Sequence, residues 1–276
     1  MDRIRLIASD MDATLLDEQS QLPADFKETI HALAELGIRF APASGRPLYT
    51  LEAMFPTLRD ELVFIGDNGG AIRWKGQNLF TSEMSPEGWR ALNRLTREQG
   101  DIAVLCGLES AYVERPFAVH DAVLRHFYTK IEYVDRLEDV TAPADKFTIY
   151  LPQHNAQQAY DTVYASQRSI YSVAVAGECW VDIMNPGVHK GAALQTLGQL
   201  WGLPSESMMA FGDTYNDAEM LQTVRYGFLM ENGSAPLRQK VPFLAPSHRE
   251  AGVMQVLHRV LAQNGCVCPE DFVPAH

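Results

Sequence analysis

The chain has 276 residues, of which 46% are hydrophobic, so it can form a large core as one big domain or as two. Its formal net charge of −12 at pH 7 argues against a broad nucleic-acid-binding surface, because binding to a phosphate backbone relies on clustered lysines and arginines. It has no apolar run near the roughly 18 residues of a membrane span, no signal-peptide pattern and no zinc-ligand spacing around its four cysteines, so we expect a cytoplasmic protein with reduced thiols.

A short apolar run at residues 6–9 ends in two carboxylates, Asp10 and Asp12. A run without polar alternation is typical of a strand that is buried on both faces of a parallel sheet. Open α/β sheets bind their ligands at the carboxyl ends of such strands. Because two buried acids are costly without a positive partner, the sequence predicts a metal ion, a lysine or both beside them.

Helices and strands alternate after this opening strand. A helix is predicted from residue 22, with Gly37 as its stop signal. The elements expected next are a strand at 38–43, a short helix at 48–55, a strand at 62–65 and a hairpin over 71–80.

The pattern becomes α+β at about residue 83 and returns to α/β at about residue 185. Within this stretch we expect helices at 86–99, 120–128 and 155–166, and strands at 102–106, 110–113, 146–151, 171–175 and 179–184. After it we expect a helix from His189 to Gly202, strands at 208–211 and 226–230, a helix after Asp217 and a last helix at 253–261. The polar tail from residue 264 is expected to be loosely held.

The sequence therefore predicts an α/β fold with a doubly wound parallel-sheet core made of two pieces, 1–82 and 185–276. An inserted α+β domain, 83–184, interrupts this core.

Polar groups follow four of the predicted core strands, at Asp10 with Asp12, at Ser44-Gly45, at Gly212-Asp213 and at Asn232. In a doubly wound sheet these strand ends converge at one edge, near Lys190 at the start of a core helix. Several carboxylates beside one lysine and one hydroxyl are suited to a hard cation and a phosphate. Oxygen ligands without a competing His or Cys spacing favour Mg²⁺ over zinc.

Asp10-Met11-Asp12-Ala13-Thr14-Leu15-Leu16, then Ser44, then Lys190, then Gly212-Asp213-x-x-Asn216-Asp217 resembles the four ordered motifs of the haloacid dehalogenase superfamily of phosphatases. The insertion resembles the cap of its Cof-type subfamily. Further stretches similar to a Cof-type sugar phosphatase are 43–46, 68–69, 106–113 and 186–190. The chain departs from the pattern at Ala13, where most members have Gly, and at Asn232-Gly233, where the family usually has Asn-Ala.

The resemblance implies a HAD-like, Rossmannoid core and a role for each matched residue. Asp10 is expected to attack phosphorus, and Asp12 to protonate the leaving alcohol and then activate water. Lys190 is expected to neutralise Asp10 and the phosphate. The expected Mg²⁺ ligands are Asp10, the backbone carbonyl of Asp12, Asp213 and, in support, Asp217. The expected phosphate-binding groups are Ser44, the Gly45 N–H and Asn216.

Two residues are expected to contact the part of the substrate that lies beyond the phosphate, and each has an alternative interpretation. Glu109, in a glycine-containing turn of the inserted domain, is expected to hydrogen-bond sugar hydroxyls, or else belongs to an ordinary hairpin turn. Arg46 is expected to contact the substrate, or else is a surface arginine.

We therefore expect a magnesium-dependent phosphatase that hydrolyses small phosphorylated metabolites, above all sugar phosphates, through an aspartyl-phosphate. We expect a monomer or weak homodimer with no nucleic-acid or membrane partner. One alternative is a phosphomutase or phosphotransferase on the same scaffold. Another is a non-catalytic sugar-phosphate-binding protein, against which the intact set Asp10, Asp12, Lys190 and Asp213 argues.

Overall fold

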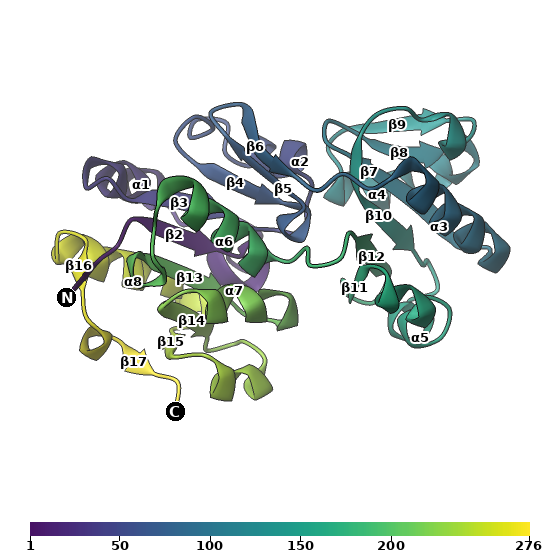
Figure 1. Cartoon of the computed structure of the whole chain (residues 1–276). Coiled ribbons are helices and arrows are strands. Elements are labelled where there is room, and N and C mark those ends of the chain that lie inside the picture. Colours follow the sequence, from purple (N-terminus) through teal and green to yellow (C-terminus); the bar gives the residue numbers. More distant parts are fainter.

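Two lobes joined by two chain crossings make up the protein in a computed structural model that describes residues 1–276 (Figure 1). The first lobe contains both chain termini, and the second contains the elements from α3 (Pro86–Gln99) to β12 (Trp180–Met184). None of the helices combines the length and the apolar character that are needed to span a membrane.

Five parallel strands form the centre of the first lobe in the order β15–β14–β13–β2–β3, with β17 antiparallel at the β15 edge. Their bounds are β2 Leu6–Ser9, β3 Arg39–Pro42, β13 Met208–Gly212, β14 Tyr226–Met230, β15 Phe243–Ala245 and β17 Val273–Pro274. The predicted α/β fold with a parallel-sheet core is thereby confirmed, although the sequence did not reveal the short strand β15.

Successive residues of the core strands point to opposite faces of the sheet. Ile7 and Phe211 pack on the face that is covered by α1 (Phe26–Glu35), α2 (Leu48–Ala53) and α8 (Gly252–Ala262). Ala8 and Ala210 pack on the face that is covered by α6 (Lys190–Trp201) and α7 (Ala218–Thr223). The helices on both faces explain why the strands are continuously apolar.

A small antiparallel sheet extends the core beyond β3. It contains β4 (Val63–Gly66), β5 (Ala71–Trp74) and β6 (Gln77–Thr81), in agreement with the predicted strand and hairpin. A single parallel bridge between Ala43 and Ile65 joins it to the end of β3. The turn after β4 therefore lies next to the turn after β3.

The second lobe is a six-stranded sheet in the order β11–β12–β10–β7–β8–β9. Its strands are β7 Ile102–Gly107, β8 Ala111–Glu114, β9 Ile131–Val134, β10 Ala144–Tyr150, β11 Ser172–Val175 and β12 Trp180–Met184. Helices α3 and α5 (Ala156–Asp161) pack on one face of this sheet. The sequence did not reveal β9, and α5 is shorter than the helix predicted at 155–166.

The other face of this sheet is partly covered by α4 (Asp121–Phe127) and otherwise faces the first lobe. On β10 it presents Lys146 and Thr148, and Thr148 is paired directly with Asp182 of β12. Alternation along β10 predicted a half-buried strand, but all seven of its residues are buried. The polar face is buried because the two lobes meet there.

The tail after residue 264 is ordered, so the expectation of a loosely held tail is wrong. Strand β16 (Cys266–Val267) pairs with β1 (Asp2–Arg3), and β17 pairs with β15. Phe272 packs edge-on against Tyr226, Phe228 and Phe243. A few apolar side chains within a polar stretch are enough to anchor it to the core.

We expect Phe272→Ala to lower the free energy of unfolding by about 3 kcal/mol, because it removes a largely buried aromatic ring from a packed cluster. Urea denaturation followed by circular dichroism measures the change. Val273→Ala is the control, because Val273 is 61% exposed, and its effect should stay within about 0.5 kcal/mol. Equal effects of the two substitutions would show that the tail does not contribute to the core.

Candidate functional site

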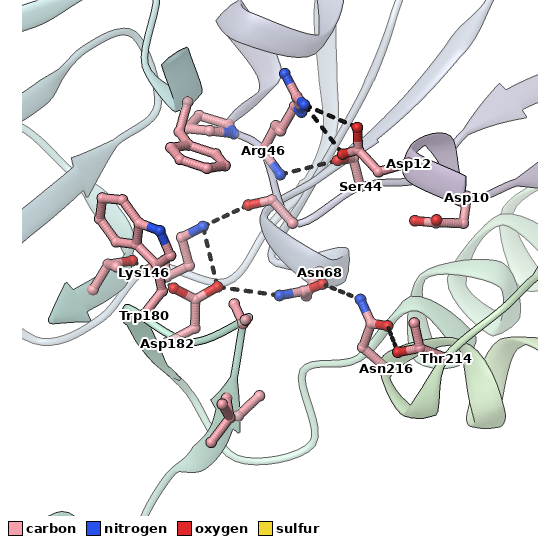
Figure 2. A pocket seen from close by; sticks show the side chains of 18 of the residues that line it. Asp10, Asp12, Ser44, Arg46, Asn68, Lys146, Trp180, Asp182, Thr214 and Asn216 are labelled. Carbon is pink, nitrogen blue, oxygen red and sulfur yellow. Dashed lines mark hydrogen bonds and ion pairs between the residues drawn. The ribbon is translucent and has the colours of Figure 1, made fainter. Parts of the chain in front are cut away.

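A cavity of about 260 Å³ lies between the lobes, at the carboxyl ends of the core strands (Figure 2). Asp10 follows β2, Ser44 follows β3, and Asn216 lies in the turn after β13; all three line the cavity. This is the sheet edge at which open α/β folds bind ligands.

The turn after β2 is unusually wide and contains a strained residue. The Leu16 N–H donates to the Met11 carbonyl, and Ala13 between them has a φ of +58°. Residues with a side chain rarely adopt this left-handed conformation, which glycine would adopt with less strain. Asn232 supports the turn, because its amide donates to the Ala13 carbonyl at 2.9 Å.

Lys190 lies between two carboxylates in the fully buried part of the site. Its ammonium donates to Asp10 and, at 2.7 Å, to Asp217. The second oxygen of Asp217 accepts the backbone N–H groups of Asp213 and Thr214, at 3.0 and 3.2 Å. Asp217 therefore fixes both the lysine and the turn that follows β13.

Two carboxylates contact this single ammonium and a third, Asp213, lies close to them, and the pKa values of Asp10 and Asp213 reflect the imbalance. Burial and the neighbouring Asp217 raise the pKa of Asp10 above its ordinary value, against the opposing effect of Lys190. Burial and Asp217 likewise raise the pKa of Asp213 to about 7. The group carries more negative charge than its protein partners neutralise.

A hard divalent cation fits this group. One oxygen from each of Asp10, Asp213 and Asp217 lies within 4.8 Å of the others. An oxygen-only donor set with excess negative charge is the kind that binds magnesium. The side chain of Asp12 is outside this group.

Asp12 is held by Arg46 on the solvent side of the cavity. The Arg46 guanidinium donates to both Asp12 carboxylate oxygens, at 3.0 and 3.1 Å, and lies 6.0 Å from the ring centre of Phe127 (Figure 2). The Arg46 side chain is only 13% exposed. It lines the cavity and is not an ordinary surface arginine.

The turn after β3 brings Ser44 and Gly45 to the cavity wall. Ser44 is buried, and its hydroxyl oxygen accepts the Arg46 N–H at 3.1 Å. The Asn68 N–H donates to the Ser44 carbonyl at 2.9 Å, so the turns after β3 and β4 support each other.

The sequence analysis did not identify a polar network that connects the two lobes. The Asn68 amide donates to Asp182 of the second lobe at 3.3 Å and accepts from Asn216 of the first at 3.4 Å (Figure 2). Lys146 contacts Asp182 from the neighbouring strand at 3.5 Å. The sequence offered one signal for this network, namely the polar residues that alternate with apolar ones along β10.

An aromatic wall in the second lobe was also missed. Phe127, Tyr128 and Trp180 line the cavity, with the rings of Phe127 and Trp180 packed edge to face at 5.1 Å. Ala174, opposite Asp182 on the edge strand, is small and leaves space beside this wall. The far end of the cavity is thus aromatic on one side and polar on the other.

Glu109 does not line this cavity. It pairs with Arg73 of β5, which is buried and also donates to Glu52 at 3.2 Å. Its neighbour Leu108 packs in the hydrophobic core of the first lobe. The turn after β7 therefore reaches the first lobe, as expected. It docks beside the cavity and not in it, because the buried Arg73 requires carboxylate acceptors such as Glu109.

Comparison with known proteins gives one family model, described as haloacid dehalogenase-like hydrolase, which matches residues 7–257. The chain is 31% identical over 262 residues to the 5-amino-6-(5-phospho-D-ribitylamino)uracil phosphatase YbjI of Escherichia coli, covering 94% of this chain and 96% of the relative. It is also 31% identical over 249 residues to the HMP-PP phosphatase of Cronobacter sakazakii, covering 87% and 89% of the two chains.

Solved structures show the same architecture. A Streptococcus mutans protein superimposes with a TM-score of 0.85 at 28% identity, covering 94% of this chain and 99% of that one. A Plasmodium vivax protein described as a putative HAD/COF-like hydrolase superimposes with a TM-score of 0.84 at 18% identity, covering 95% and 97%. The second likeness bears on the fold alone.

Proposed function

The chain belongs to the haloacid dehalogenase-like hydrolases, and from this membership we propose that it is a magnesium-dependent phosphatase of small phosphorylated metabolites. The observation that carries the proposal is the buried ammonium of Lys190 between Asp10 and Asp217. It lies beside a cavity whose wall also presents Ser44. A carboxylate nucleophile needs such positive charge to approach an anionic phosphate.

Asp10, Asp213 and Asp217 are the side chains that we propose as the magnesium site, together with the backbone carbonyl of Asp12. Their convergence and excess negative charge support this assignment. Bound magnesium would offset the repulsion between carboxylate and phosphate and stabilise the charge that develops during transfer.

Asp10 is the proposed nucleophile. Its carboxylate oxygen forms a bond to phosphorus while the bond from phosphorus to the leaving oxygen breaks, which gives an aspartyl-phosphate and an alcohol. Asp12 donates a proton to the leaving oxygen and then takes one from the water that hydrolyses the intermediate. Arg46 orients Asp12 for both steps through its contacts with both carboxylate oxygens.

Four groups are proposed to hold the phosphate. The Ser44 hydroxyl and the Gly45 N–H donate hydrogen bonds to the phosphate from the turn after β3. Lys190 supplies positive charge from its buried position beside Asp10. Asn216 orients a further oxygen from the turn after β13. Ser44, Gly45 and Asn216 all line the cavity, which supports this role.

Residues 83–184 are the proposed cap, which covers the core and contacts the leaving group. We propose sugar phosphates as the preferred class. An aromatic face such as Trp180 packs on the C–H groups of a sugar, and a carboxylate such as Asp182 accepts its hydroxyls; both residues line the cavity. The names of the Escherichia coli and Cronobacter sakazakii relatives indicate small phosphorylated substrates, which agrees with the broader class.

A panel of phosphorylated metabolites assayed for phosphate release with Mg²⁺ tests the proposal. Transfer of the phosphoryl group to an added sugar acceptor, with little release of free phosphate, would instead favour a phosphomutase or phosphotransferase. Binding of sugar phosphates without turnover of any substrate would favour a non-catalytic binding protein.

Asp10→Asn should lower kcat by a factor on the order of 1,000 or more, because an amide is a poor nucleophile of similar size. The control is Asp60→Asn, the same change at an exposed position, which should keep wild-type activity. Circular dichroism verifies that both variants are folded. Substantial turnover by a folded Asp10→Asn protein would remove the nucleophile assignment.

Asp12→Ala should reduce the hydrolysis of sugar phosphates far more than that of p-nitrophenyl phosphate, because a phenol leaves without a proton. Steady-state kcat values for the two substrates measure the difference. Equal losses would contradict the acid role of Asp12.

Adding Mg²⁺ should raise the Tm of the wild-type protein, because a cation that binds only the folded state stabilises it by about 2.7 kcal/mol at one hundred times its Kd. Asp213→Asn should abolish most of this shift, and Asp60→Asn should retain it. Differential scanning fluorimetry with and without a chelator makes the measurement. A wild-type Tm that is insensitive to Mg²⁺ would argue against the metal site.

A further inference from the structure

Lys146 is a buried cation that the proposed mechanism does not use. It extends from β10 of the cap, and its side chain is only 3% exposed. Burial alone would lower its pKa, but the carboxylates of Asp182 and Asp67 outweigh this effect and raise the pKa, so the ammonium remains charged. A buried charge of this kind needs a structural or functional reason.

The contacts of Lys146 divide between the two lobes. Its ammonium lies 3.5 Å from Asp182 in the cap and 3.0 Å from Asp67 in the turn after β4 of the core. Its shortest contact is a hydrogen bond of 2.6 Å to the Gly45 carbonyl. A cap side chain therefore holds the backbone of the turn that we propose to bind phosphate (Figure 2).

That carbonyl belongs to the peptide group between Gly45 and Arg46. Because a peptide group is planar, fixing its oxygen also fixes the direction of the Arg46 N–H. This N–H donates to the Ser44 hydroxyl oxygen at 3.1 Å. The hydroxyl is thus an acceptor on one side, and its own hydrogen remains available for a phosphate oxygen.

The same turn also directs the Arg46 side chain, whose guanidinium holds both carboxylate oxygens of Asp12. One peptide group therefore orients two groups. The first is Ser44, whose hydroxyl is proposed to donate a hydrogen bond to the phosphate, and the second is Arg46, which holds the proposed proton donor Asp12. Lys146 is the cap group that touches this peptide.

We propose that Lys146 is a positioning residue through which the cap sets the phosphate-binding turn 44–46, so that the turn takes its binding geometry only when the cap is docked on the core. The proposal rests on the phosphatase function proposed above. Two other roles are possible for a residue in this place and are distinguished by the test below: Lys146 could contact the leaving group, or it could only stabilise the fold.

The test compares Lys146→Met with Lys27→Met, the same change at an exposed lysine of α1 in the core. Calorimetry measures the affinity for inorganic phosphate with Mg²⁺ present, and kinetics give kcat/KM for p-nitrophenyl phosphate and for one sugar phosphate. We expect Lys146→Met to weaken phosphate binding about tenfold and to lower both kcat/KM values by similar factors. Lys27→Met should match the wild type.

Lys146→Arg retains a charged donor and should recover part of the phosphate affinity. An unchanged phosphate affinity in Lys146→Met would overturn the proposal. A loss confined to the sugar phosphate would also overturn it, because that pattern marks contact with the leaving group.

Removal of Lys146 leaves Asp67 and Asp182 buried without their cation, so the single variant can fail to fold. In that case Lys146→Met is introduced together with Asp67→Asn and compared with Asp67→Asn alone, using the same phosphate titration and the same criteria.

The phosphate titration also separates the two proposals. If the wild type binds phosphate but hydrolyses no ester, the proposed phosphatase function is wrong. The positioning role of Lys146 is then still tested by the change in phosphate affinity that Lys146→Met causes. If the wild type does not bind phosphate at all, both proposals fall.

Discussion

The arrangement of the core depends on one buried ammonium shared by two carboxylates. Lys190 reaches Asp10 after β2 and Asp217 after β13, so it joins strand ends that come from opposite ends of the sequence. Asp217 in turn fixes the backbone of Asp213. Removing Lys190 would leave Asp10 and Asp217 buried without their cation, which costs several kcal/mol. The same imbalance that makes the group costly also suits it to a divalent cation.

Around the cavity the boundary between the lobes is polar, although Leu108 of the second lobe packs in the hydrophobic core of the first. Asp182 contacts Asn68 at 3.3 Å and Lys146 at 3.5 Å, and Lys146 donates to the Gly45 carbonyl at 2.6 Å. Such contacts contribute little net stability compared with apolar burial, but they require a particular geometry. They therefore specify one docked position of the cap without holding it as firmly as a hydrophobic core would.

The sequence was sufficient to predict the α/β core and most of its elements, because its buried strands are apolar runs and its helices have clear stop signals such as Gly37 and Gly202. It also marked Asp10, Ser44, Asp213 and Lys190, since the ends of parallel strands meet at one edge. The roles assigned to these residues remain predictions.

Local patterns could not show how the cap meets the core. Lys146 and Asp182 follow ordinary strand alternation, and only the packing of two sheets shows that their side chains are buried together. Glu109 was expected at the substrate because its turn contains glycine, yet Arg73 lies beside it in the folded protein. The order of the tail was likewise invisible, because it depends on a few contacts such as that of Phe272 with Phe228.

The connectivity of the sheets also sets an order of assembly during synthesis. The six strands of the cap are consecutive in the sequence, so the cap can complete its sheet as soon as residue 184 has left the ribosome. Strand β2, in contrast, can pair early with β3 on one edge only; its other edge must wait for β13, and β1 must wait for β16. The nascent core therefore carries an open strand edge that the last third of the chain closes, and this interval is when the protein is most exposed to aggregation. The acidic cluster itself comes into existence only when the two ends of the chain meet.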